Sequence, residues 1–254
     1  MVYARPVNVD AYLRRIGLAG PAPLRELHRA HQAAVPFENL SIHLGEPISL
    51  ATDDLVDKVV RRRRGGFCYE LNGLFALLLE ELGHTVTRVG ARVHDGTRFG
   101  PPFDHLALLV SEPDGGGPWL ADVGFGRHSS YPLRLDERGE QVDPGGTFRL
   151  ADADGGDVDV LLDGTPQYRI ERKPRALADF APTCWWQQTW PESHFRKGPV
   201  CARLDGEGRI TLSGRKLIRT SGTERTEVVL DSDEEVLAAY EEHFGIVLAT
   251  VPKG

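Results

Sequence analysis

The sequence predicts an α+β fold in which helices come first, a β-sheet or barrel follows, and a smaller segment of strands and one helix ends the chain. Two observations predict it. Apolar residues recur at helical spacing in the first 83 residues, whereas short β-rich runs separated by Pro and Gly clusters follow from residue 85. With 254 residues, the chain can bury a large core and needs neither disulfides nor a metal ion to fold.

Four helices are expected in the first segment, where they would form a small bundle. The first covers about residues 10–17 with Asp10 as its cap, and the second covers about residues 24–35 because a proline follows. The third begins after Ser49 or Thr52 and ends at the glycine pair that follows four arginines. The fourth is marked by apolar residues at helical spacing and a closing glycine: Leu71, Leu74, Phe75, Leu78, Leu82 and then Gly83.

The middle of the chain reads as strands. Turn clusters such as DGGGP separate the β-rich runs, so a sheet or barrel is expected up to about residue 172. The runs cover residues 85–93, 105–110, 119–126, 147–151, 158–163 and 167–173. A short helix is expected over residues 176–188 and a meander over residues 201–220. Ser232 and Glu235 form a capping box for the last helix, which Gly245 closes.

Charge and composition exclude several classes of partner. Thirty Lys and Arg against 37 Asp and Glu give a net charge of −7, which disfavours nucleic acid and anionic membranes. The most apolar uncharged run, residues 71–79, is far shorter than the roughly 20 residues needed to cross a bilayer. The N-terminal residues lack the apolar region of a signal peptide, and three scattered cysteines make no disulfide framework, so we expect a cytoplasmic protein.

No metal site is expected. Cys184, His194 and Cys201 do not have the spacing of zinc ligands. The run DADGGDVD resembles a calcium loop only superficially, because glycine, aspartate and aspartate occupy positions 5, 6 and 12 of the loop. A β-turn explains this run.

The candidate nucleophile is Cys68, which follows the glycine pair Gly65 and Gly66 at the first turn of the fourth helix. The positive end of the helix dipole and the unpaired backbone N–H groups there favour the reactive thiolate form. We expect the two glycines to leave room for a substrate carbonyl to reach backbone donors that form an oxyanion hole. The alternative is a buried cysteine that packs as a small apolar side chain beside a tight turn.

A thiol nucleophile needs a base, and His105 begins a predicted strand. Asp104 would point to the opposite face of that strand and is therefore a poor partner for the ring. Asp122 lies 17 residues after His105, on the next strand, and can meet it on one face of the sheet. Each residue alone also fits a structural role, as a satisfied buried histidine or as an aspartate that hydrogen-bonds a turn.

Four motifs together resemble the arylamine N-acetyltransferase family. They are VPFENL at 35–40, RGGFCYELN at 64–72, HLALLV at 105–110 and LADVGFG at 120–126, in the family's order, and the resemblance covers about residues 10–245. It implies a helical bundle over residues 1–84, a central antiparallel β-barrel over residues 85–190 and a C-terminal α/β lid over residues 191–254. The Cys-His-Asp core would be like that of cysteine proteases and transglutaminases.

The resemblance also implies a ping-pong reaction. Cys68 would take an acetyl group from acetyl-CoA and pass it to the amino group of an arylamine or hydrazine, with His105 as base and Asp122 holding the ring. Phe37, Tyr69, Phe125 and Phe195 would contact the acceptor, and Gly124 and Gly126 would approach the cofactor. No metal is implied.

Some features leave alternatives open. Many family members have Thr where this chain has Asp104, and an anion facing the cleft would be a poor neighbour for a phosphate-bearing donor. Related amide synthases take an acyl chain from an acyl carrier protein, and a Cys-His-Asp order also occurs in hydrolases. A binding module that retains only the fold is a further alternative.

Arg64 belongs to the family motif and can pair with Glu38. The cluster Trp185, Trp186 and Trp190 fits either core packing or substrate contact.

Overall fold

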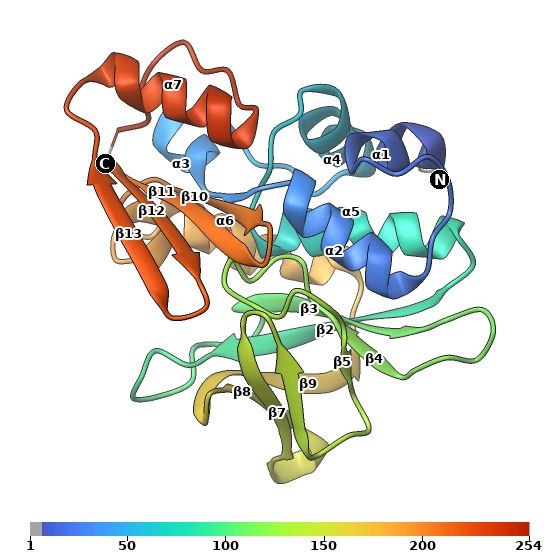
Figure 1. Ribbon diagram of the computed structural model, residues 1–254. Helices are drawn as coiled ribbons and strands as arrows, with labels where there is room; N and C mark the ends of the chain where they lie inside the picture. Colours follow the sequence, from blue (N-terminus) through green and yellow to red (C-terminus); the bar gives the residue numbers. More distant parts are fainter. Residues whose placement is uncertain (1–6, 254) are drawn as a thin grey trace.

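A group of helices, an eight-stranded antiparallel sheet and a five-stranded sheet with its own helix make up the protein (Figure 1). The computed structural model describes residues 7–253. The α+β class predicted from the sequence is confirmed, with helices first, the larger sheet second and the smaller sheet last. No helix in residues 7–253 combines the length and apolar character required to cross a membrane.

The helical segment contains the four predicted helices and one that was not predicted. The elements are α1 (Val9–Arg15), α2 (Leu24–Ala34), α3 (Leu40–Leu44), α4 (Thr52–Val56) with a π-helical turn (Asp57–Arg61), and α5 (Cys68–Glu81). Asn8, and not Asp10, caps α1: its side-chain oxygen accepts a hydrogen bond from Ala11 N at 2.9 Å, while Asp10 lies in the first turn. The additional helix α3 is only five residues long, too short to give a periodic pattern.

The central helix of this segment is α5. Eleven of its 14 residues are buried, which explains why its apolar pattern was the clearest in the sequence. Glu70 accepts a hydrogen bond from Phe67 N at 3.2 Å and so caps the first turn. Lys58 pairs with Glu70 at 2.7 Å and compensates the buried carboxylate. The N-terminal end of α5 is thus fixed by buried polar contacts.

The larger sheet is a nearly closed antiparallel barrel, as predicted. Its order is β5-β4-β3-β2-β9-β8-β7-β6. The side chain of Gln141 in edge strand β6 bonds both N and O of Arg134 in edge strand β5, at 2.7 and 3.0 Å, and so links the two edges. The strands are β2 (Thr85–Val93), β3 (His105–Ser111), β4 (Trp119–Ala121), β5 (Leu133–Arg134), β6 (Glu140–Asp143), β7 (Gly146–Asp152), β8 (Val158–Leu162) and β9 (Thr165–Pro174).

Strand β3 separates two cores. Leu106 and Leu108 belong to the core shared with α5, whereas Ala107 packs into the barrel interior with Leu120 of β4. This is the alternation of faces expected for a strand buried on both sides. His105 has the parity of Ala107 and therefore faces the barrel side of the sheet.

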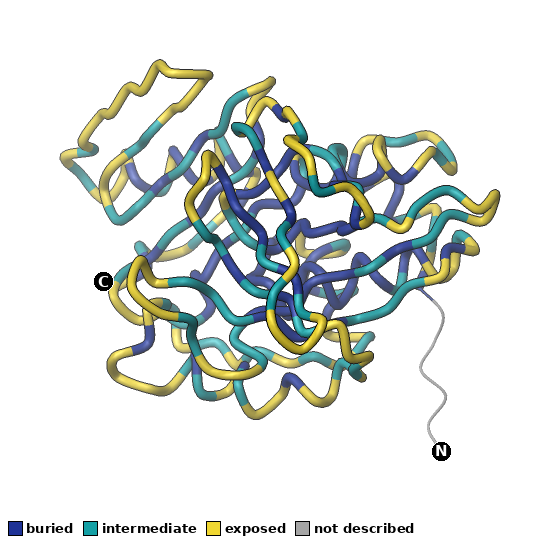
Figure 2. Tube along the Cα trace, turned by 90° about the horizontal axis from the view of Figure 1, so that it is seen from below, coloured by how far each residue is buried: buried dark blue, intermediate teal, exposed yellow. Residues whose placement is uncertain are grey.

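The smaller sheet combines one short strand from the helical segment with four strands from the C-terminal part of the chain. Its strands are β1 (Phe37–Glu38), β10 (Val200–Asp205), β11 (Gly208–Ser213), β12 (Lys216–Ser221) and β13 (Glu224–Val229), in that order. The two-residue strand β1 was not predicted, and it pairs Phe37 with Ala202. The helices α6 (Ala181–Thr189) and α7 (Asp233–Phe244) were predicted, and Ser232 caps α7. Figure 2 shows exposed segments at the periphery, where β12 and β13 form a projecting hairpin.

Candidate active site

Cys68 is the first residue of α5 and lies at a cavity of about 750 Å³. The N–H groups of the first turn of a helix have no partners within the helix, and they carry its positive end. The prediction that the glycine pair leaves room for a substrate carbonyl is wrong, because protein atoms occupy the space that a side chain would fill at each glycine. A side chain at Gly65 would meet Pro36 O at 1.8 Å, and one at Gly66 would meet the Glu70 carboxylate at 2.6 Å. These glycines allow β1 and Glu70 to approach the helix start.

His105 bridges the thiol and a carboxylate. Its Nε2 lies 2.7 Å from Asp122 Oδ2, which leaves Nδ1 for Cys68. The ring is buried, and burial alone would lower its pKa. The negative charge of Asp122 and the charge and hydrogen bond of Cys68 outweigh burial and raise the pKa of His105 to about 10. The imidazolium form is therefore the stable one at neutral pH.

Asp122 is fully buried and follows β4 directly. Four groups donate hydrogen bonds to its two oxygens, so every acceptor position of an ionised carboxylate is used. Burial would raise the pKa of Asp122, but the charge and hydrogen bond of His105 hold it well below its usual range. The donors are Asn72 Nδ2 (2.8 Å) and Gly124 N (3.0 Å) on Oδ1, and His105 Nε2 (2.7 Å) and Tyr168 Oη (2.9 Å) on Oδ2.

A buried chain of hydrogen bonds continues behind Asp122. Tyr168 gives its only hydroxyl proton to Asp122, so its oxygen accepts from His128 Nε2 at 2.7 Å. His128 Nδ1 then accepts from Ser129 Oγ at 2.8 Å. Burial lowers the pKa of His128 to about 4, which keeps this ring neutral, as the chain requires. The chain fixes the orientation of the Asp122 carboxylate.

Sequence analysis missed four members of this network: Asn72, Tyr168, His128 and Ser129. A signal existed for Asn72, because it is the one polar side chain in the apolar run 71–79, four positions after Cys68 and hence on the same face. Tyr168 and His128 come from separate parts of the barrel, and nothing in their local sequence ties them to Asp122.

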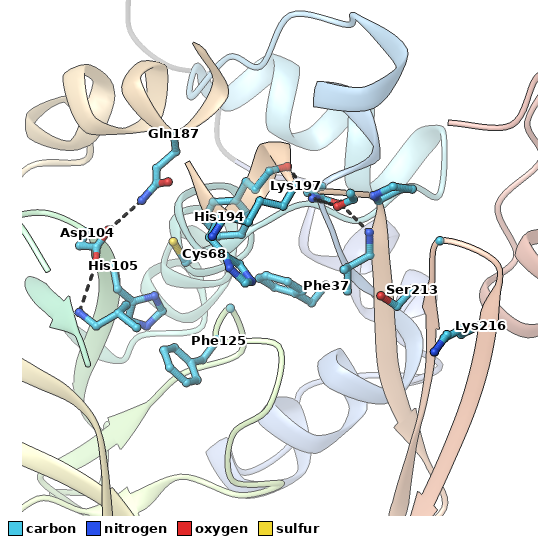
Figure 3. A pocket seen from close by; sticks show the side chains of 18 residues that line it. Phe37, Cys68, Asp104, His105, Phe125, Gln187, His194, Lys197, Ser213 and Lys216 are labelled. Carbon is cyan, nitrogen blue, oxygen red and sulfur yellow. Dashed lines mark hydrogen bonds between the residues drawn. The ribbon is translucent and has the colours of Figure 1, made fainter. Parts of the chain in front are cut away.

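The cavity beside Cys68 has aromatic walls (Figure 3). Phe37, Phe125 and Phe195, three of the four predicted contact residues, line it. Tyr69 does not: its side chain is fully buried, and its hydroxyl donates to the backbone O of Phe103 at 2.8 Å. Tyr69 thus supports the loop before β3 from behind the wall.

Gly124 and Gly126 allow the turn after β4 to pack closely against α5 and β1. A side chain at Gly124 would meet Cys68 Cα at 2.7 Å, and one at Gly126 would meet the ring of Phe37 at 3.0 Å. Gly126 also has φ +80°, a conformation that glycine adopts without strain. Gly124 lines the cavity at Cys68, and Gly126 lines a second cavity of about 540 Å³.

Comparison with known proteins identifies the family. A family model described as N-acetyltransferase matches residues 22–252. An arylamine N-acetyltransferase from Mycolicibacterium smegmatis is 38% identical over 95% of this chain and 93% of its own length. One from Escherichia coli is 35% identical over 81% of this chain and 76% of its own length. The chain belongs to the arylamine N-acetyltransferase family.

Solved structures of arylamine N-acetyltransferases share the whole architecture. The M. smegmatis protein gives a TM-score of 0.87 at 36% identity, covering 94% of this chain and 92% of that one. The Mycobacterium marinum arylamine N-acetyltransferase, solved in complex with CoA, gives a TM-score of 0.86 at 33% identity, covering 94% and 93%.

Three arginines line the second cavity of this arylamine N-acetyltransferase family member, and one of them, Arg225, pairs with Glu227. Arg127 and Arg209 line it, and neither forms an ion pair with a carboxylate in residues 7–253. Burial, and then the charge of Arg127, lower the pKa of Arg209 to about 10. Phe37 and Phe125 line both cavities, so the two adjoin. Because Glu207 and Glu224 also line this cavity, its three arginines leave only a small local excess of positive charge on a chain whose overall charge is −7.

The structure also locates Arg64 and the tryptophans that the sequence analysis singled out. Arg64 pairs with Glu38 at 3.0 Å in a buried contact, as predicted, and is not free to bind a ligand. Trp185 and Trp190 are 65% and 47% exposed, so they belong neither to the core nor to the cavity walls. In the described part of the chain, no group of three His, Cys, Asp or Glu residues is arranged to hold a metal ion.

Proposed function

We propose that this protein transfers the acetyl group of acetyl-CoA, through an acetyl-Cys68 intermediate, to the amino group of an arylamine or hydrazine. One observation carries the proposal: the thiol at the start of α5 is hydrogen-bonded to His105, which a fully satisfied Asp122 holds in place, at an aromatic-walled cavity. The names of the relatives support the arylamine acceptor, and the complex of the M. marinum protein with CoA supports the donor.

In the first half of the reaction, the thiolate of Cys68 forms a bond with the carbonyl carbon of the thioester. The bond between that carbon and the CoA sulfur breaks, and the departing sulfur takes the proton of His105. First-turn N–H groups and the positive end of α5 stabilise the negative oxygen that forms on the way.

In the second half, the amine nitrogen attacks the carbonyl carbon of acetyl-Cys68. Neutral His105 accepts one proton of the amine through Nδ1, because Nε2 remains bonded to Asp122. The bond to the Cys68 sulfur breaks, the amide leaves, and the thiolate and imidazolium are restored. Protons and charges balance over the cycle without a further reactant.

The second cavity suits the phosphate end of the donor. Arg127 and Arg209 supply charge without carboxylate partners in residues 7–253, and guanidinium groups bind phosphates in bidentate fashion. Because the two cavities adjoin at Phe37 and Phe125, a pantetheine arm could run from there to Cys68. Gly124 lines the first cavity and Gly126 the second, so this arm would run past both residues.

Intact-mass measurement tests the intermediate. Incubation with acetyl-CoA should add one acetyl group to the protein, and Cys68→Ala should remain unmodified. CoA release should then require an added arylamine or hydrazine. An unmodified wild-type protein would overturn the CoA-donor assignment, and rapid CoA release without any amine would show a hydrolase. Loading only from an acylated carrier protein would show an amide synthase.

A phosphate-free thioester tests the donor site. Arg209→Gln should raise KM for acetyl-CoA about tenfold or more, as expected for loss of a charge-assisted phosphate contact. The same variant should use the acetyl thioester of N-acetylcysteamine, which has no phosphates, as well as the wild type does. Equal losses with both donors would place Arg209 in a structural role.

A further inference from the structure

An unpaired carboxylate lies in the wall of the reaction cavity. Asp104 lines the cavity together with Cys68 and His105, and it is partly exposed there. It forms no ion pair with a Lys or Arg side chain anywhere in residues 7–253. Its placement in the cleft is notable because the sequence suggested that it would face away from the ring of its neighbour.

The carboxylate is held in position by donors only. Gln187 Nε2 donates to Oδ1 at 2.7 Å, and Val93 N donates to Oδ2 at 3.3 Å. The amide of Gln187 cannot turn over without loss, because its oxygen accepts from the buried Ser193 hydroxyl at 2.7 Å. Each Asp104 oxygen therefore keeps acceptor capacity for a further donor from the cavity.

Burial and the neighbouring groups act in opposite directions on the pKa of Asp104. Burial raises the pKa of Asp104, while the Val93 N–H, the His105 charge and the Gln187 amide favour the ionised form. Since both protein contacts donate to it, the geometry fits a carboxylate that carries no proton of its own.

The cavity is electrostatically asymmetric. Figure 3 shows Asp104 and Gln187 on one side of Cys68, and Lys197, Ser213 and Lys216 on the other. A small ring bound beside Cys68 would lie near the acidic side, while the basic side leads toward β12. The part of the acceptor that faces Asp104 therefore meets a negative charge in a partly desolvated wall.

We propose that Asp104 is a specificity-determining residue that favours acceptors with a cationic or N–H-donating substituent remote from the reacting nitrogen, and disfavours arylamines that carry a carboxylate. This inference rests on the proposed function, since it concerns the acceptor of the second half-reaction. A cationic or N–H donor could use the free acceptor capacity of the Asp104 oxygens, whereas a substrate carboxylate would meet like charge.

Three matched acceptors test the inference: 4-aminobenzamidine, 4-aminobenzamide and 4-aminobenzoate, which are cationic, neutral and anionic. We would measure kcat/KM for each from CoA release, in the wild type and in Asp104→Asn. The ratio of benzoate to benzamidine should rise about tenfold or more in the variant, with the benzamide between them; tenfold corresponds to about 1.4 kcal/mol. Comparing ratios between the two proteins cancels the different nucleophilicities of the amines.

Two further variants control for charge and fold. Glu234→Gln removes one exposed carboxylate on α7, away from the cavity, and should leave the ratio unchanged. Asp104→Glu keeps the charge and should retain most of the wild-type preference. If Asp104→Asn fails to fold, Asp104→Thr, whose hydroxyl can still accept from Gln187, replaces it.

Outcomes for this inference and for the proposed function can be separated. Acetylation of Cys68 by acetyl-CoA, measured by intact mass on each protein, reports the first half-reaction alone. If wild-type Cys68 is not acetylated, the proposed function fails. If Cys68 is acetylated and amines are consumed, but the ratio is the same in the wild type and in the folded Asp104 variants, the specificity role is overturned.

Discussion

Asn72 donates a hydrogen bond to Asp122 from a position one helical turn after Cys68, with 2.8 Å between Nδ2 and Oδ1. The same side chain donates to Leu106 O at 2.6 Å and accepts from Val123 N at 2.9 Å. One amide therefore ties α5 to both β3 and the turn after β4. Because α5 also carries Cys68, the helix sets the position of the thiol relative to the carboxylate.

Asn72→Ala should lower activity and stability together. Two buried backbone groups and one carboxylate oxygen would each lose a partner, at about 1–3 kcal/mol for an unsatisfied buried group. We expect a lower thermal midpoint and a fall in kcat/KM of about tenfold or more, since Asp122 would be less well oriented. Asn72→Asp, which keeps the shape but adds a negative charge next to Asp122, should be worse still. Unchanged kcat/KM in a folded Asn72→Ala protein would contradict this account.

The His105–Asp122 pair predicts a pH dependence of stability. The folded pKa of His105, about 10, exceeds the ordinary value of about 6.5, so its contribution is complete below pH 6.5 and is lost as pH rises toward 10. Asp122 behaves in the opposite sense: its lowered pKa gives a contribution that is present above pH about 4 and is lost in acid. Stability from the pair is therefore greatest between about pH 4 and 6.5.

Denaturant unfolding at several pH values measures this contribution. From pH 6.5 to 10, the free energy of unfolding should fall more steeply in the wild type than in Asp122→Asn, by at most about 1.4 kcal/mol per pH unit. Parallel curves for the two proteins would mean that His105 is not held as a cation by Asp122.

The three thiols should differ sharply in reactivity. Burial raises the pKa of both Cys184 and Cys201, which keeps them as unreactive thiols, whereas Cys68 opens onto the cavity beside an imidazolium. Iodoacetamide at pH 6 should add a single group, at Cys68, and Cys68→Ser should take up none on the same timescale. His105→Gln should slow the modification about tenfold or more, because the ring that hydrogen-bonds the Cys68 sulfur and can act as its base is gone. Peptide mapping that finds Cys184 modified as fast as Cys68 would refute this prediction.

The sequence predicted those parts of the site that depend on local periodicity. Cys68 follows from a helix start, and His105 follows from alternation along a strand with one face in the barrel. Asp122 lies just beyond its strand, yet the spacing placed it on the correct face. These relationships depend only on neighbours in the chain.

The remaining parts depend on contacts between distant segments. The glycine pair was misinterpreted because Pro36, which occupies the space beside Gly65, directly precedes a two-residue strand that carries no periodic signal. Likewise, the orientation of Asp104 toward the cavity depends on Gln187, 83 residues away in the chain. A single sequence contains no information on which of many possible partners such a residue meets.

Gly124→Ala should disrupt the site through close packing alone. The added methyl group would lie 2.7 Å from Cys68 Cα and 2.8 Å from Asn72 Nδ2, and the first of these is backbone that cannot turn away. We expect a loss of about 1–3 kcal/mol in stability, as for other overpacked sites, and a fall in kcat/KM of more than about tenfold as the turn moves away from the thiol.

Gly20→Ala is the matched control for Gly124→Ala, because a side chain there would meet no atom within 4 Å in the described part of the chain. Its stability should stay within about 0.5 kcal/mol of the wild type, with full activity. Thermal unfolding and steady-state CoA release on both variants make the comparison. If Gly124→Ala behaves like Gly20→Ala, the turn after β4 is more pliable than the contact with Cys68 implies, and its approach to the nucleophile is not needed for catalysis.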